Sequence, residues 1–172
     1  IPSLNFPIAI ATLFAAVITL TARAQGTGDR PFISELVAVG NESFQDEDGG
    51  TPDWLEIYNP TDGVINLDGY HLTDDSTELT KWTFPNFQLA PGGYLVVFAS
   101  DKDRAAAGSP FHTNFKLSGS GEYLALIGPD GTTIASEFAP DFPAQAAGFS
   151  YGVEGPAPEG DCGYFDPPSP GA

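Results

Sequence analysis

The sequence predicts an all-β fold in which about eight to nine short strands form two packed sheets. Three observations support this. Glycine and proline are abundant, with 20 and 16 residues in a chain of 172. From residue 32 onward the apolar runs are short, and turn residues separate them. No stretch of this part shows sustained helical periodicity.

The first strands are predicted by alternation and by turn signals. Residues 32–39 are largely apolar, and residues 53–59 place Leu55 and Ile57 on one face of a strand. The sequence Pro-Thr-Asp-Gly at 60–63 predicts a turn, because proline presets φ and glycine accepts a positive φ.

The middle of the chain predicts short strands at 64–67, 70–73 and 81–84. Residues 94–99 (YLVVFA) are apolar and β-branched enough for a central strand that is buried on both faces. A single helical turn is expected at 101–107, because its first residues include aspartates at the positive end of the dipole.

The last predicted strands are 114–117, 122–127 and 132–138. The final two form a hairpin around the turn sequence Pro-Asp-Gly at 129–131. From residue 141 we expect an irregular closing segment, which becomes a Pro- and Gly-rich linker toward residue 172.

An apolar run at residues 6–20 precedes the body of the chain. Ala22 and Ala24 follow it in the small-x-small pattern of a signal-peptide cleavage site. The run suits an apolar signal-peptide helix better than a membrane span, which needs about 20 residues. A retained N-terminal anchor is the alternative. We expect a signal peptide at 1–24, transient membrane contact through it alone, and secretion or display at the cell surface.

Four blocks of sequence, in order, carry a resemblance to a known family. They are 53–60 (DWLEIYNP), 65–74 (INLDGYHLTD), 81–97 from KWTFP to GGYLVV, and 114–131 from NFKLS to the Pro-Asp-Gly turn. The chain resembles the lamin-tail domain, in the form found in bacterial secreted proteins. Tyr70 stands where the family usually has tryptophan, so the aromatic character is kept.

The resemblance implies an immunoglobulin-like β-sandwich at 32–140, joined to the signal peptide by a linker at 25–31. It implies no reaction, because the family has no shared catalytic site. Animal lamin tails bind protein partners and, in some cases, DNA. The closing segment at 141–172 resembles one that ends this domain before further domains begin, so we expect a fragment of a larger multidomain protein.

Charge is the most unbalanced property of the chain, with 23 Asp and Glu against 6 Lys and Arg and a net charge of -17. Such a surface repels phosphate backbones and anionic membranes, which argues against nucleic-acid binding. It favours cations and basic partners, although solubility alone would also explain it. Cys162 is the only cysteine, so no internal disulfide can form.

The acidic loop DEDGGTPD at 46–53 is the candidate metal site. Its carboxylates Asp46, Asp48 and Asp53 are of the type that Ca²⁺ prefers. The loop is not an EF-hand, because positions 6 and 12 counted from Asp46 are Thr51 and Ile57. A solvated hairpin loop is the alternative, and calcium is the only cofactor that we consider.

Aromatic side chains at the surface would bind carbohydrate by stacking, and Trp54, Tyr70 and Trp82 are the candidates. The alternative is that they belong to the core, since large aromatics are usually buried there. Glu56 lies between two aromatics in its strand, where pairing with Lys81 or Lys116 across the sheet is one expectation.

We find no catalytic motif. The two histidines, His71 and His112, have no metal-site spacing, and there is neither a phosphate-binding loop nor a nucleophile elbow. We therefore expect a non-catalytic extracellular or cell-surface module that binds a protein or a polysaccharide. Two alternatives stay open: a calcium-stabilised adhesion or carbohydrate-binding module, and an accessory domain of a secreted enzyme whose catalytic domain lies downstream.

Overall fold

A computed structural model describes residues 23–26, 28–40, 44–155, 157 and 160–171. In this part of the chain thirteen strands form and no helix does, so the predicted all-β class is confirmed. No helix among these residues has the length and apolarity that a membrane crossing requires.

The larger sheet has six strands in the order β13-β12-β2-β3-β8-β9. All neighbours are antiparallel except β8 and β9, which run parallel. Its strands are β13 (Cys162–Phe165), β12 (Ser150–Val153), β2 (Phe32–Val37), β3 (Asp53–Tyr58), β8 (Tyr94–Ala99) and β9 (Phe111–His112).

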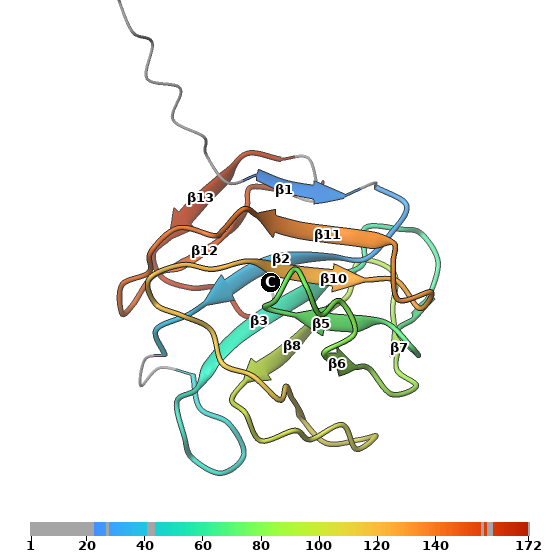
Figure 1. Ribbon diagram of the computed structural model, residues 1–172, viewed down its shortest axis with the longest axis horizontal. Coiled ribbons are helices and arrows are strands. Elements are labelled where there is room, and N and C mark those ends of the chain that lie inside the picture. Colours follow the sequence, from blue (N-terminus) through green and yellow to red (C-terminus); the bar gives the residue numbers. More distant parts are fainter. Residues whose placement is uncertain (1–22, 27, 41–43, 156, 158–159, 172) are drawn as a thin grey trace, which may run out of the picture.

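The second sheet has five antiparallel strands in the order β1-β11-β10-β5-β6, and β4 and β7 form a separate ribbon. In Figure 1, β11, β10 and β5 lie across β2, β3 and β8. The strands are β1 (Arg23–Gly26), β11 (Ile134–Ala139), β10 (Leu124–Ile127), β5 (His71–Thr73), β6 (Trp82–Thr83), β4 (Ile65–Asn66) and β7 (Gln88–Leu89).

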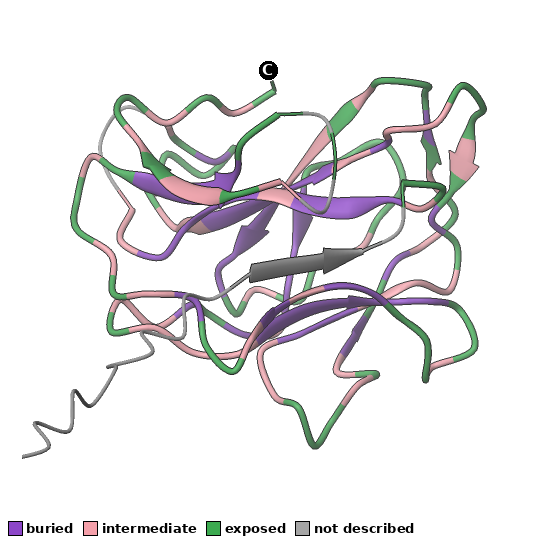
Figure 2. Cartoon of the chain, turned by 90° about the horizontal axis from the view of Figure 1, so that it is seen from above, coloured by how far each residue is buried: buried purple, intermediate pink, exposed green. Residues whose placement is uncertain are grey.

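The core lies between the two sheets, where the buried strands of the two layers meet in Figure 2. On β3, Leu55 and Ile57 point into this core, as the alternation predicts, and leave Trp54 and Glu56 on the outer face. A β-bulge in β2 between Ile33 and Glu35 shifts the register against β3.

Several strands lie close to their predicted places. Tyr94–Ala99 forms β8 with the predicted bounds, and β10 and β11 form the predicted hairpin. The strand expected at 114–117 is wrong, because the pairing with β8 is made earlier, by β9. The helical turn expected at 101–107 is also wrong: Asp101 and Asp103 have φ values of 63° and 52°, in the left-handed region.

The closing segment is more regular than expected. In place of an irregular linker, β12 pairs with β2 and β13 pairs with β12, so the sandwich continues to Phe165. Gly152 permits this pairing, because a Cβ there would meet the Ser34 carbonyl oxygen at 2.1 Å.

The predicted signal peptide falls largely on residues 1–22, outside the described part of the chain. Residues 23–26 form β1, which pairs with β11. The expected cleavage point after Ala24 therefore lies within a strand, and the expected linker at 25–31 begins in the same strand.

Candidate functional site

The acidic loop between β2 and β3 folds over the outer face of the six-stranded sheet. Phe44 attaches it there, with its ring centroid 5.6 Å from those of Trp54 and Phe98. Val37 and Val96 complete this small apolar cluster, which is separate from the main core. The apolar contact brings the carboxylates of the loop to the segment that follows β8.

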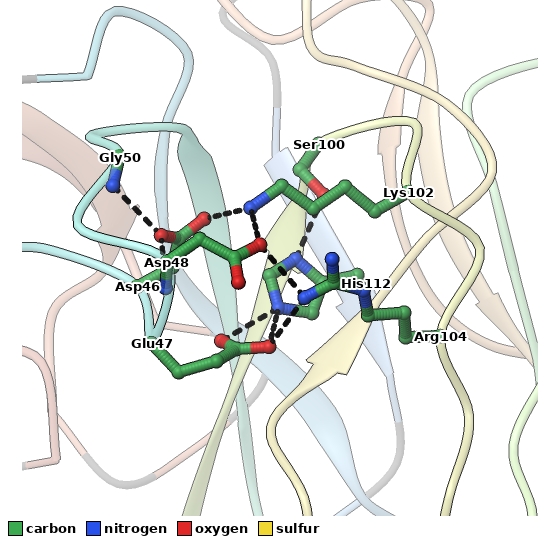
Figure 3. A network of polar contacts seen from close by, with 8 residues as sticks. All are labelled: Asp46, Glu47, Asp48, Gly50, Ser100, Lys102, Arg104 and His112. Carbon is green, nitrogen blue, oxygen red and sulfur yellow. Dashed lines mark hydrogen bonds and ion pairs between the residues drawn. The ribbon is translucent and has the colours of Figure 1, made fainter.

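Asp46 organises the loop. Its side chain is buried, and one carboxylate oxygen accepts hydrogen bonds from the backbone N–H groups of Asp48 and Gly50, at 3.0 and 2.8 Å. The other oxygen accepts one from Lys102 Nζ. Asp48 Oδ2 is 2.7 Å from Lys102 Nζ and 2.8 Å from an Arg104 nitrogen. Figure 3 shows these ion pairs converging from the two loops.

His112 lies beneath this network and is fully buried. Its Nε2 is 2.9 Å from Glu47 Oε2, its Nδ1 is 2.8 Å from Ser100 Oγ, and its ring stacks on Phe98. The same Glu47 carboxylate accepts a hydrogen bond from Arg104 at 2.8 Å. This histidine belongs to β9 and connects the acidic loop to the sheet (Figure 3).

The pKa values of Asp46, Glu47 and Asp48 are all lowered. Burial alone would raise the pKa of Asp46, but hydrogen bonds from Lys102 and from the backbone of Gly50 outweigh it. The hydrogen bond from His112 lowers the pKa of Glu47, and those from Lys102 and then Arg104 lower the pKa of Asp48. These three carboxylates are therefore held in their ionised form.

Asp53, the third predicted calcium ligand, does not take part in this network. Its two oxygens accept hydrogen bonds from the backbone N–H groups of Gly40 and Leu117, at 3.2 and 3.3 Å, and burial raises its pKa. Lys102 lies where a cation shared by Asp46 and Asp48 would have to lie, so such an ion would displace it.

A different set of ligand atoms lies closer together. Oxygens of Asp46 and Glu47 and a nitrogen of His112 are all within 4.8 Å of one another. Two of these residues are outside the predicted calcium set. The calcium site therefore stays a prediction. Asp46 and Asp48 share Lys102, whereas Asp53 lines the same cavity as Asp46, of about 300 Å³, but bonds to backbone N–H groups instead.

Two of the three aromatic candidates are part of the packed interior. Trp54 and Trp82 are each 3% exposed. Trp54 lies under Phe44, and the Trp82 ring packs against that of Phe84 at a centroid distance of 4.8 Å. A surface binding role does not fit this burial. Tyr70 is partly exposed and lines a cavity of about 200 Å³, so it alone keeps an accessible ring.

Sequence reasoning missed a pair of glutamates. Glu35 on β2 and Glu56 on β3 are register partners on the outer face of the larger sheet, 3% and 1% exposed. Glu35 accepts hydrogen bonds from the Ser169 backbone N–H at 2.9 Å and from its hydroxyl at 3.0 Å. Glu56 accepts one from Ser34 Oγ at 2.7 Å and one from the Gly171 backbone N–H.

These contacts correct the expected pairing of Glu56 with Lys81 or Lys116. Lys81 pairs instead with Asp74, at 2.6 Å. Within the described residues, no lysine, arginine or histidine forms an ion pair with Glu56 or with Glu35. Burial raises the pKa of Glu56, and the charge of Glu35 raises it further, although the two hydrogen bonds lower it in part.

A cavity of about 270 Å³ opens beside the two glutamates. Tyr58 and Tyr94 form an aromatic wall, with their rings stacked at a centroid distance of 4.5 Å. The signal available in the sequence was Glu35, a charged residue in the otherwise largely apolar strand FISELV. Its alignment with Glu56 could not be predicted, because it depends on the bulge in β2.

Comparison with known protein families gives a match to a described domain family. The Lamin Tail Domain matches residues 24–139, which is two thirds of the chain and includes every strand from β2 to β11. No curated protein shows a significant match to this chain. The two-sheet architecture agrees with the immunoglobulin-like sandwich that the resemblance implies. The chain therefore belongs to the lamin tail domain family.

Proposed function

We propose that this chain is a non-catalytic interaction module, exported or displayed at the cell surface, that binds a basic partner. The partner is a protein or a cationic polysaccharide. Membership of the lamin tail domain family supports the absence of catalysis, and the apolar run at 6–20 supports export.

One observation carries the proposal: of the six lysines and arginines of the chain, at least three already pair with carboxylates of the same chain. Lys81, Lys102 and Arg104 each pair with carboxylates of the same chain. With a net charge of -17, most carboxylates have no internal counter-charge. The uncompensated negative field attracts positively charged partners and speeds their association.

The Ser100–His112–Glu47 series does not change this proposal, although it has the residue types of a nucleophilic triad. The His112 imidazole is completely buried and both of its nitrogens have partners. A general base has to reach the proton of a substrate or nucleophile in an accessible site. Glu47 also pairs with Arg104, so the series is best explained as an anchor for the acidic loop.

The proposal is tested by calorimetric titration of the folded chain with a ten-residue lysine peptide, at about 0.15 M salt. A ten-residue glutamate peptide is the control. We expect saturable binding of the lysine peptide that weakens as salt rises, and no binding of the glutamate peptide. No lysine-peptide binding, or equal binding after the chain is unfolded in urea, would contradict a folded interaction module.

A second candidate function is that of a calcium-stabilised adhesion module, which the convergence of the Asp46 and Asp48 carboxylates on one cationic group favours, since Ca²⁺ prefers oxygen ligands. Thermal melting in calcium and in chelator tests it. A midpoint that rises with calcium in the natural chain but not in Asp46→Asn supports the ion site. An unchanged midpoint removes it, and the interaction module is then the remaining proposal.

A further inference from the structure

The glutamate pair has hydrogen bonds but no counter-charge. Glu35 and Glu56 are almost completely buried, and every donor that reaches them from the described residues is neutral: two backbone N–H groups and two hydroxyls. Each carboxylate oxygen accepts one of these bonds, although it has two lone pairs. The pair therefore has acceptor capacity that the described part of the chain does not use.

Such an arrangement is unfavourable without a cation. A carboxylate removed from water is destabilised unless it is paired and hydrogen-bonded, and a second carboxylate alongside adds repulsion. The chain has a few cations, but Lys81 and Lys102 are paired elsewhere. An external cation would supply the missing charge.

The adjoining cavity has the size and the wall for a cationic side chain. Its volume of about 270 Å³ exceeds that of a single water several-fold, and both glutamates line it. Tyr58, Tyr94 and Phe165 also line it, and aromatic faces attract ammonium and guanidinium groups. Tyr94 is 37% exposed, so the wall extends to the surface where a partner would arrive.

We propose that this cavity binds a cationic side chain of the partner, an ammonium or a guanidinium, between the Glu35 and Glu56 carboxylates and the Tyr58–Tyr94 wall. The proposal rests on the proposed function and names the site that would carry it. The carboxylates supply charge-assisted hydrogen bonds, and the stacked tyrosines contact the alkyl part and the cationic end.

The experiment titrates the ¹⁵N-labelled full chain with N-acetyl-lysine methylamide and, separately, with N-acetyl-arginine methylamide. N-acetyl-norleucine methylamide is the neutral control of similar shape. We expect saturable amide shifts at residues 34–35, 56–58 and 94 with at least one cationic probe, and none with norleucine. Binding of the lysine probe alone identifies an ammonium site, and binding of the arginine probe alone identifies a guanidinium site. Binding of both probes identifies a site that is selective only for positive charge.

Two variants and one control substitution localise the effect. Glu35→Gln combined with Glu56→Gln should weaken binding at least about tenfold, as the loss of a buried charge partner does. Glu122→Gln, which removes a partly buried carboxylate on another part of the surface, should leave binding unchanged. Tyr94→Leu should weaken binding a few-fold, because it removes part of the aromatic wall and leaves both glutamates in place. It therefore tests the site even if the double glutamine variant fails to fold.

Absence of shifts at the cavity, or shifts that survive the double substitution, would overturn the site. If the lysine peptide still binds the folded chain while the cavity shows no response, the site is wrong and the interaction module stands. If neither the peptide nor the small probes bind, both proposals fail.

Discussion

Glu35 and Glu56 lie opposite each other on neighbouring strands, and the end of the chain covers both. The backbone N–H of Ser169 reaches Glu35 and that of Gly171 reaches Glu56, across 134 and 115 residues of sequence. These contacts lie beyond residue 139, where the family match ends. The closing segment is thus part of the folded unit in this chain.

Ser169→Ala should destabilise the fold, because it removes the hydroxyl that donates to Glu35 and leaves that oxygen without its partner. We expect a loss of about 1 kcal/mol in the free energy of unfolding, measured by urea denaturation. The control is Ser109→Ala, at an exposed turn position. Equal effects of the two substitutions would show that the contact of Ser169 contributes nothing.

The stability of the Glu56→Gln variant, relative to the natural chain, should increase as pH rises. Burial raises the pKa of Glu56, so its protonated form is preferred in the folded state. Below about pH 4.5, the ordinary pKa of a glutamate, Glu56 is protonated in both the folded and the unfolded chain. Its contribution to the stability of the fold is then fully present. Between that value and the raised pKa, the unfolded chain ionises first and the natural protein loses stability. Glutamine cannot ionise, and its amide can still accept from Gly171 and donate to Ser34.

The free energy of unfolding of Glu56→Gln, relative to the natural chain, should therefore be higher at pH 7 than at pH 4. Urea denaturation at both values measures it. Glu78→Gln, at an exposed position, is the charge control. A relative stability that is the same at both pH values, or lower at pH 7, would contradict the raised pKa of Glu56.

Lys102→Met should release the acidic loop, because it leaves the buried Asp46 carboxylate without its cation. We expect a loss of about 1–3 kcal/mol in the free energy of unfolding at pH 7. The lowered pKa values of Asp46 and Asp48 mean that this stabilisation is present above pH 3.8 and is lost as pH falls through the folded-state values. The difference between variant and natural chain should therefore shrink in acid.

The matched control is Lys116→Met, since this exposed lysine forms no ion pair within the described residues. Its effect should be within about 0.5 kcal/mol. Equal losses for the two lysine substitutions would mean that charge number, and not the bridge to Asp46, determines stability.

Gly152→Ala should separate β12 from β2. A methyl group there would meet backbone atoms of Ser34 and Glu35 at 2.1 and 2.9 Å, which the strand pair cannot accommodate. We expect faster amide hydrogen exchange in β12 and β13 and lower thermal stability. Gly63→Ala, where a Cβ meets nothing within 4 Å, is the control. Unchanged exchange in β12 would show that the close approach to β2 is not required.

The sequence predicted the strands whose burial follows from their own pattern of apolar residues. The alternation around Leu55 and Ile57 predicted β3, and the apolar run of β8 predicted a central strand. The β12–β13 pair was not predictable in this way. Its strands are short and contain Gly152 and Gly163, and they form because β2 offers an edge for pairing.

The sites were less predictable than the strands, because they depend on contacts between distant segments. The sequence marked Asp46 and Asp48 as a cation site, but the cation they meet is Lys102, more than 50 residues away. Nothing in the sequence indicated that Glu35 pairs with Glu56, because only the bulged register of β2 places the two side by side. Carboxylates are visible in a sequence, but their partners are set by the fold.

Binding of a cationic partner through the uncompensated negative charge of this folded module can be measured directly. The measurement is the calorimetric titration with the ten-residue lysine peptide, made in parallel on the natural chain and on the Glu35→Gln, Glu56→Gln double variant. We expect saturable, salt-sensitive binding to the natural chain that is at least about tenfold weaker in the variant. No binding to the folded natural chain would contradict it.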